Sequence, residues 1–250
     1  FMKYKPETVI NLAAQAGVRF SIENPRAYID SNLVGFFNVL QCCRDFPINH
    51  LLYASSSAVY GDNRQVPNCE SDNSDKPISL YAATKKSEEL MAYSYCKLYG
   101  IKASGLRFFT VYGPNGRPDM AYYKFAEKIK KGEAIEVYNK GEIFRDFTYI
   151  DDVVESIFRL LNITPNKDEN DAYHKIYNVG SGTPNSVNDM IEILEKYIGK
   201  KAIRKNLPMQ KADVFLNYAK TQELENVIGY KPAVSLDEGL KRFVEWMKLN

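Results

Sequence analysis

The sequence predicts an α/β fold in which a doubly wound parallel sheet is interleaved with a smaller second lobe. Three observations support this prediction. Apolar runs typical of buried strands alternate with longer helical segments, which is the pattern of βαβ units. After about Gly113 the units become shorter and more mixed, as expected for a second lobe. The 250 residues, 45% of them hydrophobic, can form one large domain or two small ones around a buried core.

The elements of the first half follow in a regular order. The expected elements are a strand over residues 8–14, a helix over 24–44, a strand over 50–54, a helix over 81–99 and a strand over 103–109. Pro25 suits the first turn of the first helix, and Gly100 is a natural stop for the second. The polar residues 62–77 between them are expected to form a loop.

The second half alternates over shorter distances. The expected elements are a helix that runs to Lys131, a strand over 135–138, a helix over 151–161, a strand over 176–179 and a helix over 187–198. We place the sheet domain at 1–112, with a contribution from about 147–180, and the second lobe at 113–146 and 181–250. Ligands bind doubly wound sheets at the carboxyl ends of the strands, so the loops after Ala13, Ala54 and Phe109 are expected to carry the chemistry.

Composition argues against several classes of function. The formal net charge is only +2, without the basic excess that nucleic-acid binding needs, and no apolar run approaches the roughly 20 residues that span a bilayer. The two histidines show no metal-ligand spacing, which argues against a zinc site and a histidine-based triad. The four cysteines form neither a C-x-x-C pair nor a dense disulfide framework, so we expect a reducing compartment, the cytoplasm.

Tyr81 and Lys85 lie one helical turn apart in an expected helix. An ammonium at this spacing favours the phenolate and can bring the pKa of about 10 of a tyrosine towards neutrality, which makes a general base. Tyr93 and Tyr197 also have a lysine four residues later, but only Tyr81 follows a strand that ends in hydroxyls, residues 55–57. These serines could equally cap the next turn.

Several motifs together resemble one family. Residues 53–61 (YASSSAVYG) and 79–86 (SLYAATKK) resemble the Ser/Thr-Tyr-Lys regions of extended short-chain dehydrogenases that act on nucleotide sugars, the NAD-dependent epimerase/dehydratase family. The similarity continues through residues 12–18 (LAAQAGV), 30–35 (DSNLVG), 106–114 (LRFFTVYGP), 116–120 (GRPDM) and 145–152 (RDFTYIDD). It is greatest to the members that epimerise UDP-glucuronate at C4, and it implies a Rossmann-type sheet.

The resemblance implies a reaction that needs no external redox partner. Tyr81 would take the proton from the sugar C4 hydroxyl, Ser56 would hydrogen-bond the same oxygen, and Lys85 would hold the cofactor ribose. NAD would take up the hydride and return it to the other face of a transient 4-keto sugar. The resemblance implies these cofactor-binding residues: Ala13, Ala14, Gln15, Asn32, Ser55, Tyr81, Lys85 and Phe108.

Comparison within the family favours a carboxylate substrate. The 4,6-dehydratases have an Asp-Glu pair where this chain has Ser57 and Ala58, and UDP-glucose epimerases have Asn at Thr110 and Arg at Gln210. Small hydroxyls and Arg117 suit a C6 carboxylate, because charge-assisted hydrogen bonds are strong. The resemblance implies these substrate-binding residues, with Arg145 and Asp213 at the UDP phosphates and ribose: Ser57, Thr110, Arg117, Met120, Phe125, Tyr138, Arg145 and Asp213. Arg117 could instead be a solvated loop residue.

The glycine-rich strand-turn-helix that cradles the NAD pyrophosphate in the family does not occur among the 14 glycines. The turn Gly180-Ser181-Gly182 mimics its opening, but Asn185 stands where the third glycine belongs. We therefore expect roughly 70 to 80 residues to be missing before Phe1. The Rossmann domain would then be N-terminally incomplete and hold half of the NAD site.

Several readings of the function stay open. The first is an NAD-dependent UDP-glucuronate 4-epimerase; UDP-glucose 4-epimerase and UDP-glucuronate decarboxylase are alternatives within the same enzyme class. A truncated, non-catalytic module that binds sugar nucleotides is the alternative from another class. The resemblance also implies a homodimer, formed through the helices over 24–44 and 81–99, and a role in supplying polysaccharide synthesis.

Overall fold

The computed structural model describes residues 1–63, 65–210 and 213–249. The chain forms two compact units. Unit 1 consists of Phe1–Phe108, Ser156–Val179 and Lys220–Tyr230, and unit 2 of Phe109–Glu155, Gly180–Ala219 and Lys231–Asn250. The domain boundaries expected from the sequence stay a prediction, and the two units are described separately below.

Unit 1 is built on a four-stranded parallel sheet, which confirms the predicted α/β fold class. Its order is β1 (Thr8–Asn11), β2 (His50–Ser56), β3 (Ala103–Phe108) and β7 (His174–Val179). The apolar run of β2 is buried on both faces, as parallel sheets covered by helices require. The register pairs Ser56 with Phe108 and Phe108 with Val179, so these strands end side by side.

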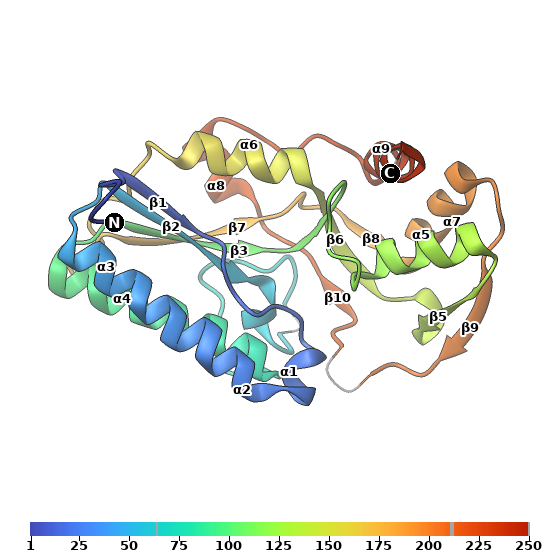
Figure 1. Cartoon of the computed structure of the whole chain (residues 1–250), viewed down its shortest axis with the longest axis horizontal. Coiled ribbons are helices and arrows are strands. Elements are labelled where there is room, and N and C mark those ends of the chain that lie inside the picture. Colours follow the sequence, from blue (N-terminus) through green and yellow to red (C-terminus); the bar gives the residue numbers. More distant parts are fainter. Residues whose placement is uncertain (64, 211–212, 250) are drawn as a thin grey trace. The chain divides into compact units, whose positions relative to one another are not determined.

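Helices cover the sheet of unit 1 on both faces. The helices of this unit, in chain order, are α1 (Phe20–Glu23), α2 (Pro25–Tyr28), the π-helix η1 (Ile29–Val34), α3 (Gly35–Asp45), the 3₁₀ turn η2 (Ser57–Tyr60), α4 (Leu80–Tyr99) and α8 (Gln222–Ile228). Helices α3 and α4 lie side by side on one face, and α8 lies on the other (Figure 1). Helix α6 (Ile150–Leu160) begins in unit 2 and ends in unit 1.

The helix expected over residues 24–44 is interrupted by the π-helix η1. Such wide turns often occur at functional sites. Here the turn contains Asn32, a polar residue that is only 1% exposed. Its amide forms hydrogen bonds outside the helix, described below, and these explain why a polar side chain is buried in this turn.

Unit 2 has its own sheets and core. Three parallel strands, β4 (Thr110–Tyr112), β6 (Phe144–Tyr149) and β10 (Leu216–Asn217), pair in the order β10-β6-β4. Strand β8 (Pro184–Ser186) pairs with β6 in the antiparallel direction. Strands β5 (Ala134–Tyr138) and β9 (Ile203–Leu207) form a separate parallel pair. Its helices are α5 (Ala121–Lys131), the turn η3 (Asn139–Gly141), α7 (Val187–Ile198) and α9 (Leu236–Leu249). Ser186 and Asp189 form a capping box at the start of α7.

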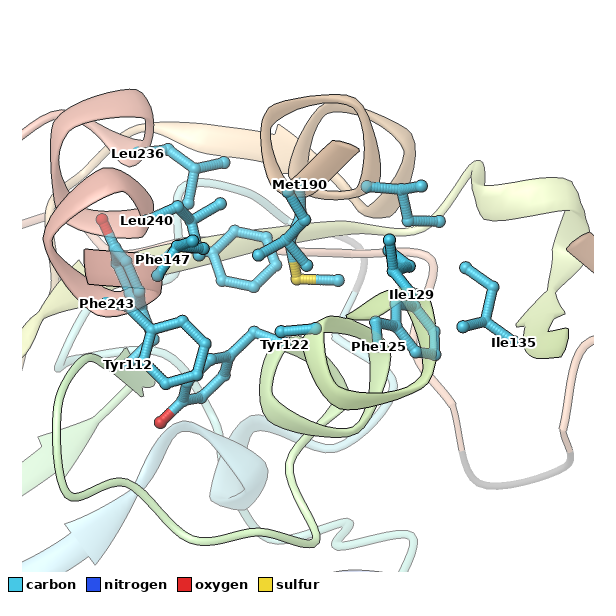
Figure 2. Close-up of a cluster of buried hydrophobic side chains, with 14 of the residues drawn as sticks. Tyr112, Tyr122, Phe125, Ile129, Ile135, Phe147, Met190, Leu236, Leu240 and Phe243 are labelled. Atoms are coloured by element: carbon cyan, nitrogen blue, oxygen red, sulfur yellow. The ribbon is translucent and has the colours of Figure 1, made fainter. Parts of the chain in front are cut away.

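The core of unit 2 is rich in aromatic rings. Tyr122 of α5 meets Phe243 of α9 edge-to-face with ring centroids 4.9 Å apart, and Tyr112 of β4 meets Tyr122 at 6.0 Å (Figure 2). Met190 of α7 is also part of this core. Helix α9 therefore closes a core that begins with β4, more than 120 residues earlier. In the described residues of both units, no helix is long and apolar enough to cross a membrane.

Candidate active site

The strand ends of unit 1 carry the hydroxyls expected from the sequence. Ser56 ends β2 and is 9% exposed. Its Oγ accepts a hydrogen bond of 3.2 Å from the amide of Ala58, so the side chain caps the 3₁₀ turn η2 that Ser57 begins. The capping role left open for these serines is therefore real for Ser56. A hydroxyl that accepts one hydrogen bond can still donate its own proton.

Tyr81 lies in the first turn of α4, as expected. Ser79 caps this helix by accepting a hydrogen bond of 3.1 Å from the amide of Ala82. The half-buried ring of Tyr81 packs edge-to-face on Tyr28 with centroids 6.0 Å apart, and the Tyr28 hydroxyl donates to the carbonyl of Gly17 at 2.5 Å. Tyr81 is thus packed against a side chain that also holds the loop after β1.

Lys85 is buried one turn further along α4. Its side chain is 3% exposed, and Nζ donates to the carbonyl of Ala54 at 2.8 Å and to Glu88 Oε2 at 3.0 Å. The carbonyl of Ala54 belongs to β2, next to the serines at the strand end. The ammonium of Lys85 on α4 is therefore fixed to the backbone of β2, two residues before Ser56.

Asn32 holds the loop that follows β1. Its Oδ1 accepts from the amide of Gln15 at 2.8 Å, and its Nδ2 donates to the carbonyl of Gln15 at 3.1 Å and to Thr84 Oγ1 at 2.9 Å. One buried side chain thus links this loop to α4. Ala13 and Ala14 precede Gln15 in the same loop, and Phe108 ends β3. The structure brings these predicted cofactor residues to the carboxyl end of the sheet.

A buried ion pair lies next to the carboxyl ends of β2 and β3. Glu89 accepts two hydrogen bonds of 2.8 Å from Arg107 and a third, of 2.6 Å, from the hydroxyl of Ser55. The side chains of both charged residues are under 5% exposed. Burial raises the pKa of Glu89, but the hydrogen bonds and charge of Arg107 outweigh it, and the net pKa is lowered. Ser55, expected at the cofactor, uses its hydroxyl in this network.

The sequence analysis missed this network. Arg107 also donates to the carbonyl of Glu70 at 3.3 Å, and Glu70 Oε1 accepts from the amide of Asn178 on β7 at 2.8 Å. These contacts join residues far apart in the sequence, so no local pattern announces them. One local signal does exist: Glu88 and Glu89 follow Lys85 by three and four residues, which places them on the same side of the helix.

Glu88 is the second buried carboxyl beside Lys85. Burial raises its pKa to about 7, although the charge of Lys85 and its hydrogen bond lower it. Glu88 and Glu89 are neighbours on one helix, yet their pKa values shift in opposite directions. The reason is that Glu89 has a bidentate arginine partner and Glu88 has only one hydrogen bond from Lys85.

The predicted substrate residues of unit 2 are spread over its sheets and helices. Thr110 begins β4, Met120 precedes α5 and Tyr138 ends β5; the side chains of all three are half-buried. Phe125 packs in the hydrophobic core and is 9% exposed, so its present contacts are those of a core residue. Its predicted role at the substrate stays a prediction.

The two predicted arginines differ in burial. Arg117 forms two hydrogen bonds with Asp119, of 2.9 and 2.6 Å, and both side chains are about half exposed. Arg145 on β6 donates to the carbonyls of Phe144 and Val214, at 2.8 and 2.7 Å. Burial lowers the pKa of Arg145 and the charge of Asp213 raises it, with a lowered net pKa. A buried guanidinium near one carboxylate suits an anionic ligand.

The glycine turn after β7 is held by a carboxylate of its own chain. Asp146 is fully buried and accepts from the amides of Ser181, Gly182 and Ala219 at 2.7, 3.0 and 3.0 Å. A Cβ on Gly180 would lie 2.6 Å from Asp146 Oδ2. These amides are therefore used internally, and the expectation that this turn does not bind NAD stays a prediction.

Comparisons with known proteins cover nearly the whole chain. The sequence profile described as the NAD dependent epimerase/dehydratase family matches residues 1–180. A probable UDP-glucuronate 4-epimerase of Rhizobium meliloti is 48% identical over 98% of this chain and 76% of its own length.

Two solved structures are similar at 30% identity. UDP-glucuronic acid 4-epimerase from Bacillus cereus, in complex with UDP-glucuronic acid and NAD, has a TM-score of 0.88 over 97% of this chain and 76% of that one. UDP-glucose 4-epimerase from Thermotoga maritima, with UDP-glucose, has a TM-score of 0.91 over 100% and 79%.

Proposed function

The chain belongs to the NAD dependent epimerase/dehydratase family, and from this premise we propose that it converts UDP-glucuronate to UDP-galacturonate by epimerisation at C4. It is an isomerase of UDP-sugars that depends on NAD. The observation that carries the proposal is the buried Lys85, held by the carbonyl of Ala54 one helical turn after Tyr81. A cation in this position favours a phenolate, which a binding module has no need for.

The residues of unit 1 divide the proton chemistry between them. Tyr81 takes the proton from the C4 hydroxyl as that carbon is oxidised and returns it when the 4-keto sugar is reduced. Ser56 donates its hydroxyl proton in a hydrogen bond to the C4 oxygen, while its Oγ stays fixed by the amide of Ala58. Lys85, held by the carbonyl of Ala54, stabilises the phenolate.

The residues present fit NAD. The ammonium of Lys85 has three N–H donors, and two of them have partners in the residues that the structure describes. The third suits a ribose hydroxyl. Asn32 forms two hydrogen bonds with the backbone of Gln15, which fixes the loop of residues 13–15 before the cofactor binds. Ser55 and Phe108 lie at the adjacent strand ends. When bound, NAD accepts the C4 hydride and returns it.

The residues of unit 2 support a carboxylate substrate. In unit 2, Thr110 and Arg117 offer a hydroxyl and a guanidinium to the C6 carboxylate. We assign Arg145 and Asp213 to the UDP phosphates and ribose, and Met120, Phe125 and Tyr138 to the surrounding nucleotide site. The 48% identity to a probable UDP-glucuronate 4-epimerase supports the same substrate.

Replacing Tyr81 tests the proposed base. Tyr81→Phe should lower turnover of UDP-glucuronate by at least about 100-fold, because general-base catalysis contributes that much or more. The Kd for UDP-glucuronate should change little, since the ring is kept. Tyr93→Phe is the matched control, because Tyr93 precedes Lys97 on the same helix with the same spacing, and it should stay active. Comparable turnover in Tyr81→Phe would place the base elsewhere.

Product analysis with three substrates tests the substrate class. UDP-galacturonate from UDP-glucuronate supports the proposal. Preferred turnover of UDP-glucose identifies a UDP-glucose 4-epimerase instead, and release of CO₂ from UDP-glucuronate identifies a decarboxylase. Binding of UDP-sugars without any turnover would favour the non-catalytic module.

We also propose a homodimer in the cytoplasm that supplies polysaccharide synthesis. Apolar side chains exposed on η1, α3 and α4 support the dimer; they are Val34 (51% exposed), Phe37 (43%), Leu90 (61%) and Leu98 (68%). All four cysteines are free thiols, as in a reducing compartment. Light scattering at several concentrations measures the mass, and a monomer throughout would refute the dimer.

A further inference from the structure

Glu88 is a buried carboxyl that the mechanism above leaves unused. It is 1% exposed, and its Oε2 lies 3.0 Å from Lys85 Nζ. Its other oxygen, Oε1, is buried and has no hydrogen-bond partner among the described residues. A buried polar atom without a partner costs free energy, so such atoms are rare in native structures and often have a function.

Glu88 is the one contact of the Lys85 ammonium, among the described residues, that can change its charge. Only the carbonyl of Ala54 and Glu88 accept hydrogen bonds from Nζ in the described part of the chain. The carbonyl is a fixed backbone group, whereas the carboxyl can be charged or neutral. When Glu88 is ionised it offsets the positive charge of Lys85; when it is protonated, that charge acts in full on nearby groups.

Glu88 is a buried carboxyl whose pKa lies near neutral pH. Burial favours its neutral form, with a pKa of about 7, while Arg107 holds Glu89 in the ionised form. In the described residues, the other titratable or charged groups on elements packed against α4 are His50 and Tyr53 on β2, Arg107 on β3, His174, Lys175 and Tyr177 on β7, Tyr60 on η2, Cys42, Cys43, Arg44 and Asp45 on α3, Asp30 on η1, Arg26 and Tyr28 on α2, and Glu23 on α1.

The neighbouring groups with shifted pKa values keep one charge state near neutral pH. Burial lowers the pKa of His174 to about 4 and that of His50 below its ordinary value of 6.5, so both favour the neutral form at pH 7. Burial raises the pKa of Tyr53 well above its usual range and that of Cys43 to about 12, and both stay uncharged. Asp30 is exposed and paired with Arg26.

We propose that Glu88 is a positioning residue that holds the Lys85 ammonium and, by carrying or losing its own negative charge, sets how strongly that ammonium favours ionised Tyr81. This inference rests on the proposed function, in which Tyr81 is the base. It adds a group that the three-residue Ser56-Tyr81-Lys85 set does not contain. The enzyme's base then responds to two coupled titrations rather than one.

The direction of the effect follows from the charges. Glu88→Gln removes the negative charge while its amide oxygen can still accept from Lys85. The uncompensated ammonium then lowers the pKa of Tyr81. Seven residues of α-helix separate Tyr81 from Glu88, about 10 Å along the axis. At that distance a unit charge shifts a pKa by roughly 0.3 to 1.2 units, depending on the effective dielectric constant.

Titration of tyrosinate absorbance tests the inference without turnover. The signal of Tyr81 is the difference between a protein with Tyr81 and the same protein with Tyr81→Phe, measured in the wild-type and Glu88→Gln backgrounds. Glu245→Gln makes the same charge change at an exposed position of α9 and is the control. Glu88→Asp restores the charge and tests for rescue.

The expected result is a Tyr81 titration at lower pH in Glu88→Gln, at the wild-type pH in Glu245→Gln, and close to it in Glu88→Asp. The acid limb of kcat should move in the same direction. Equal titrations in wild type and Glu88→Gln, or a Glu88→Asp protein that behaves like Glu88→Gln, would overturn the inference. A protein that acts on another sugar, or on none, refutes the proposed function, but the Tyr81 titration still decides the role of Glu88.

Discussion

Glu89→Gln should destabilise the protein far more than Asp119→Asn, although both remove the charge of a carboxylate bound to arginine. Glu89 and Arg107 are both under 5% exposed, whereas Arg117 and Asp119 are 45% and 57% exposed. Removing one member of a buried pair leaves an uncompensated buried charge and costs about 3–5 kcal/mol. An exposed pair contributes at most about 1 kcal/mol.

The assay is thermal and urea unfolding at pH 7. For a chain of this size, 1 kcal/mol corresponds to about 2–4 °C in Tm, so Glu89→Gln should lower Tm by roughly 6–20 °C and Asp119→Asn by no more than about 4 °C. The lowered pKa of Glu89 adds a pH signature. Its stabilisation is present above the ordinary carboxyl pKa of about 4.5 and is lost as the pH falls through its folded-state value.

Equal losses of stability in the two variants would refute this reasoning. A Glu89→Gln protein whose free energy of unfolding lies within about 1 kcal/mol of the wild-type value would also refute it, because a buried unpaired charge should cost more. The double variant Glu89→Gln with Arg107→Met offers a control. Removing both charges should recover part of the loss, because no unpaired charge then remains buried.

Three further predictions follow from buried groups. The stability of wild type relative to Glu88→Gln should fall by about 3 kcal/mol as the pH rises from 4.5 to 7, because over this range Glu88 keeps its proton in the folded state and releases it in the unfolded state. If urea unfolding gives the same stability difference between the two proteins at every pH, the raised pKa of Glu88 is contradicted. Asp146→Ala should cost at least about 3 kcal/mol, since three amides lose their acceptor, and an unchanged Tm would show that another group replaces it. Phe243→Ala should cost about 3–5 kcal/mol in calorimetry through the cavity left beside Tyr122, and a loss below 1 kcal/mol would mean that α9 is not part of the core.

The parts of the fold with a local signal could be predicted from the sequence. Helix α4 begins one residue before the expected start and ends at Tyr99, because Ser79 and Gly100 are capping residues whose effect is local. Helix α7 matches its expected range, Val187–Ile198. The spacing of Leu236, Leu240 and Phe243 also marks one helical face, although the sequence analysis assigned no element to α9.

The supporting groups of the candidate site could not be predicted in the same way. In the sequence, Glu89 and Arg107 look like solvated charges. The register of β2 and β3 places Arg107 beside Ser55, and Glu89 on α4 binds both of them. Asp146 lies in a strand whose partners come from distant segments. The π-helix around Asn32 likewise depends on the loop that its side chain binds. Such long-range contacts carry no period and no turn signature.

The way in which the chain alternates between its two units has a consequence for biosynthesis. The sheet of unit 1 receives its fourth strand only at His174–Val179, and the same unit contains Lys220–Tyr230. The core of unit 2 needs Leu240, Phe243 and Val244 of α9. On a ribosome, therefore, β3 emerges long before its partner β7. Folding of both units must wait until almost all of these residues are synthesised, and the nascent chain is exposed to chaperones meanwhile.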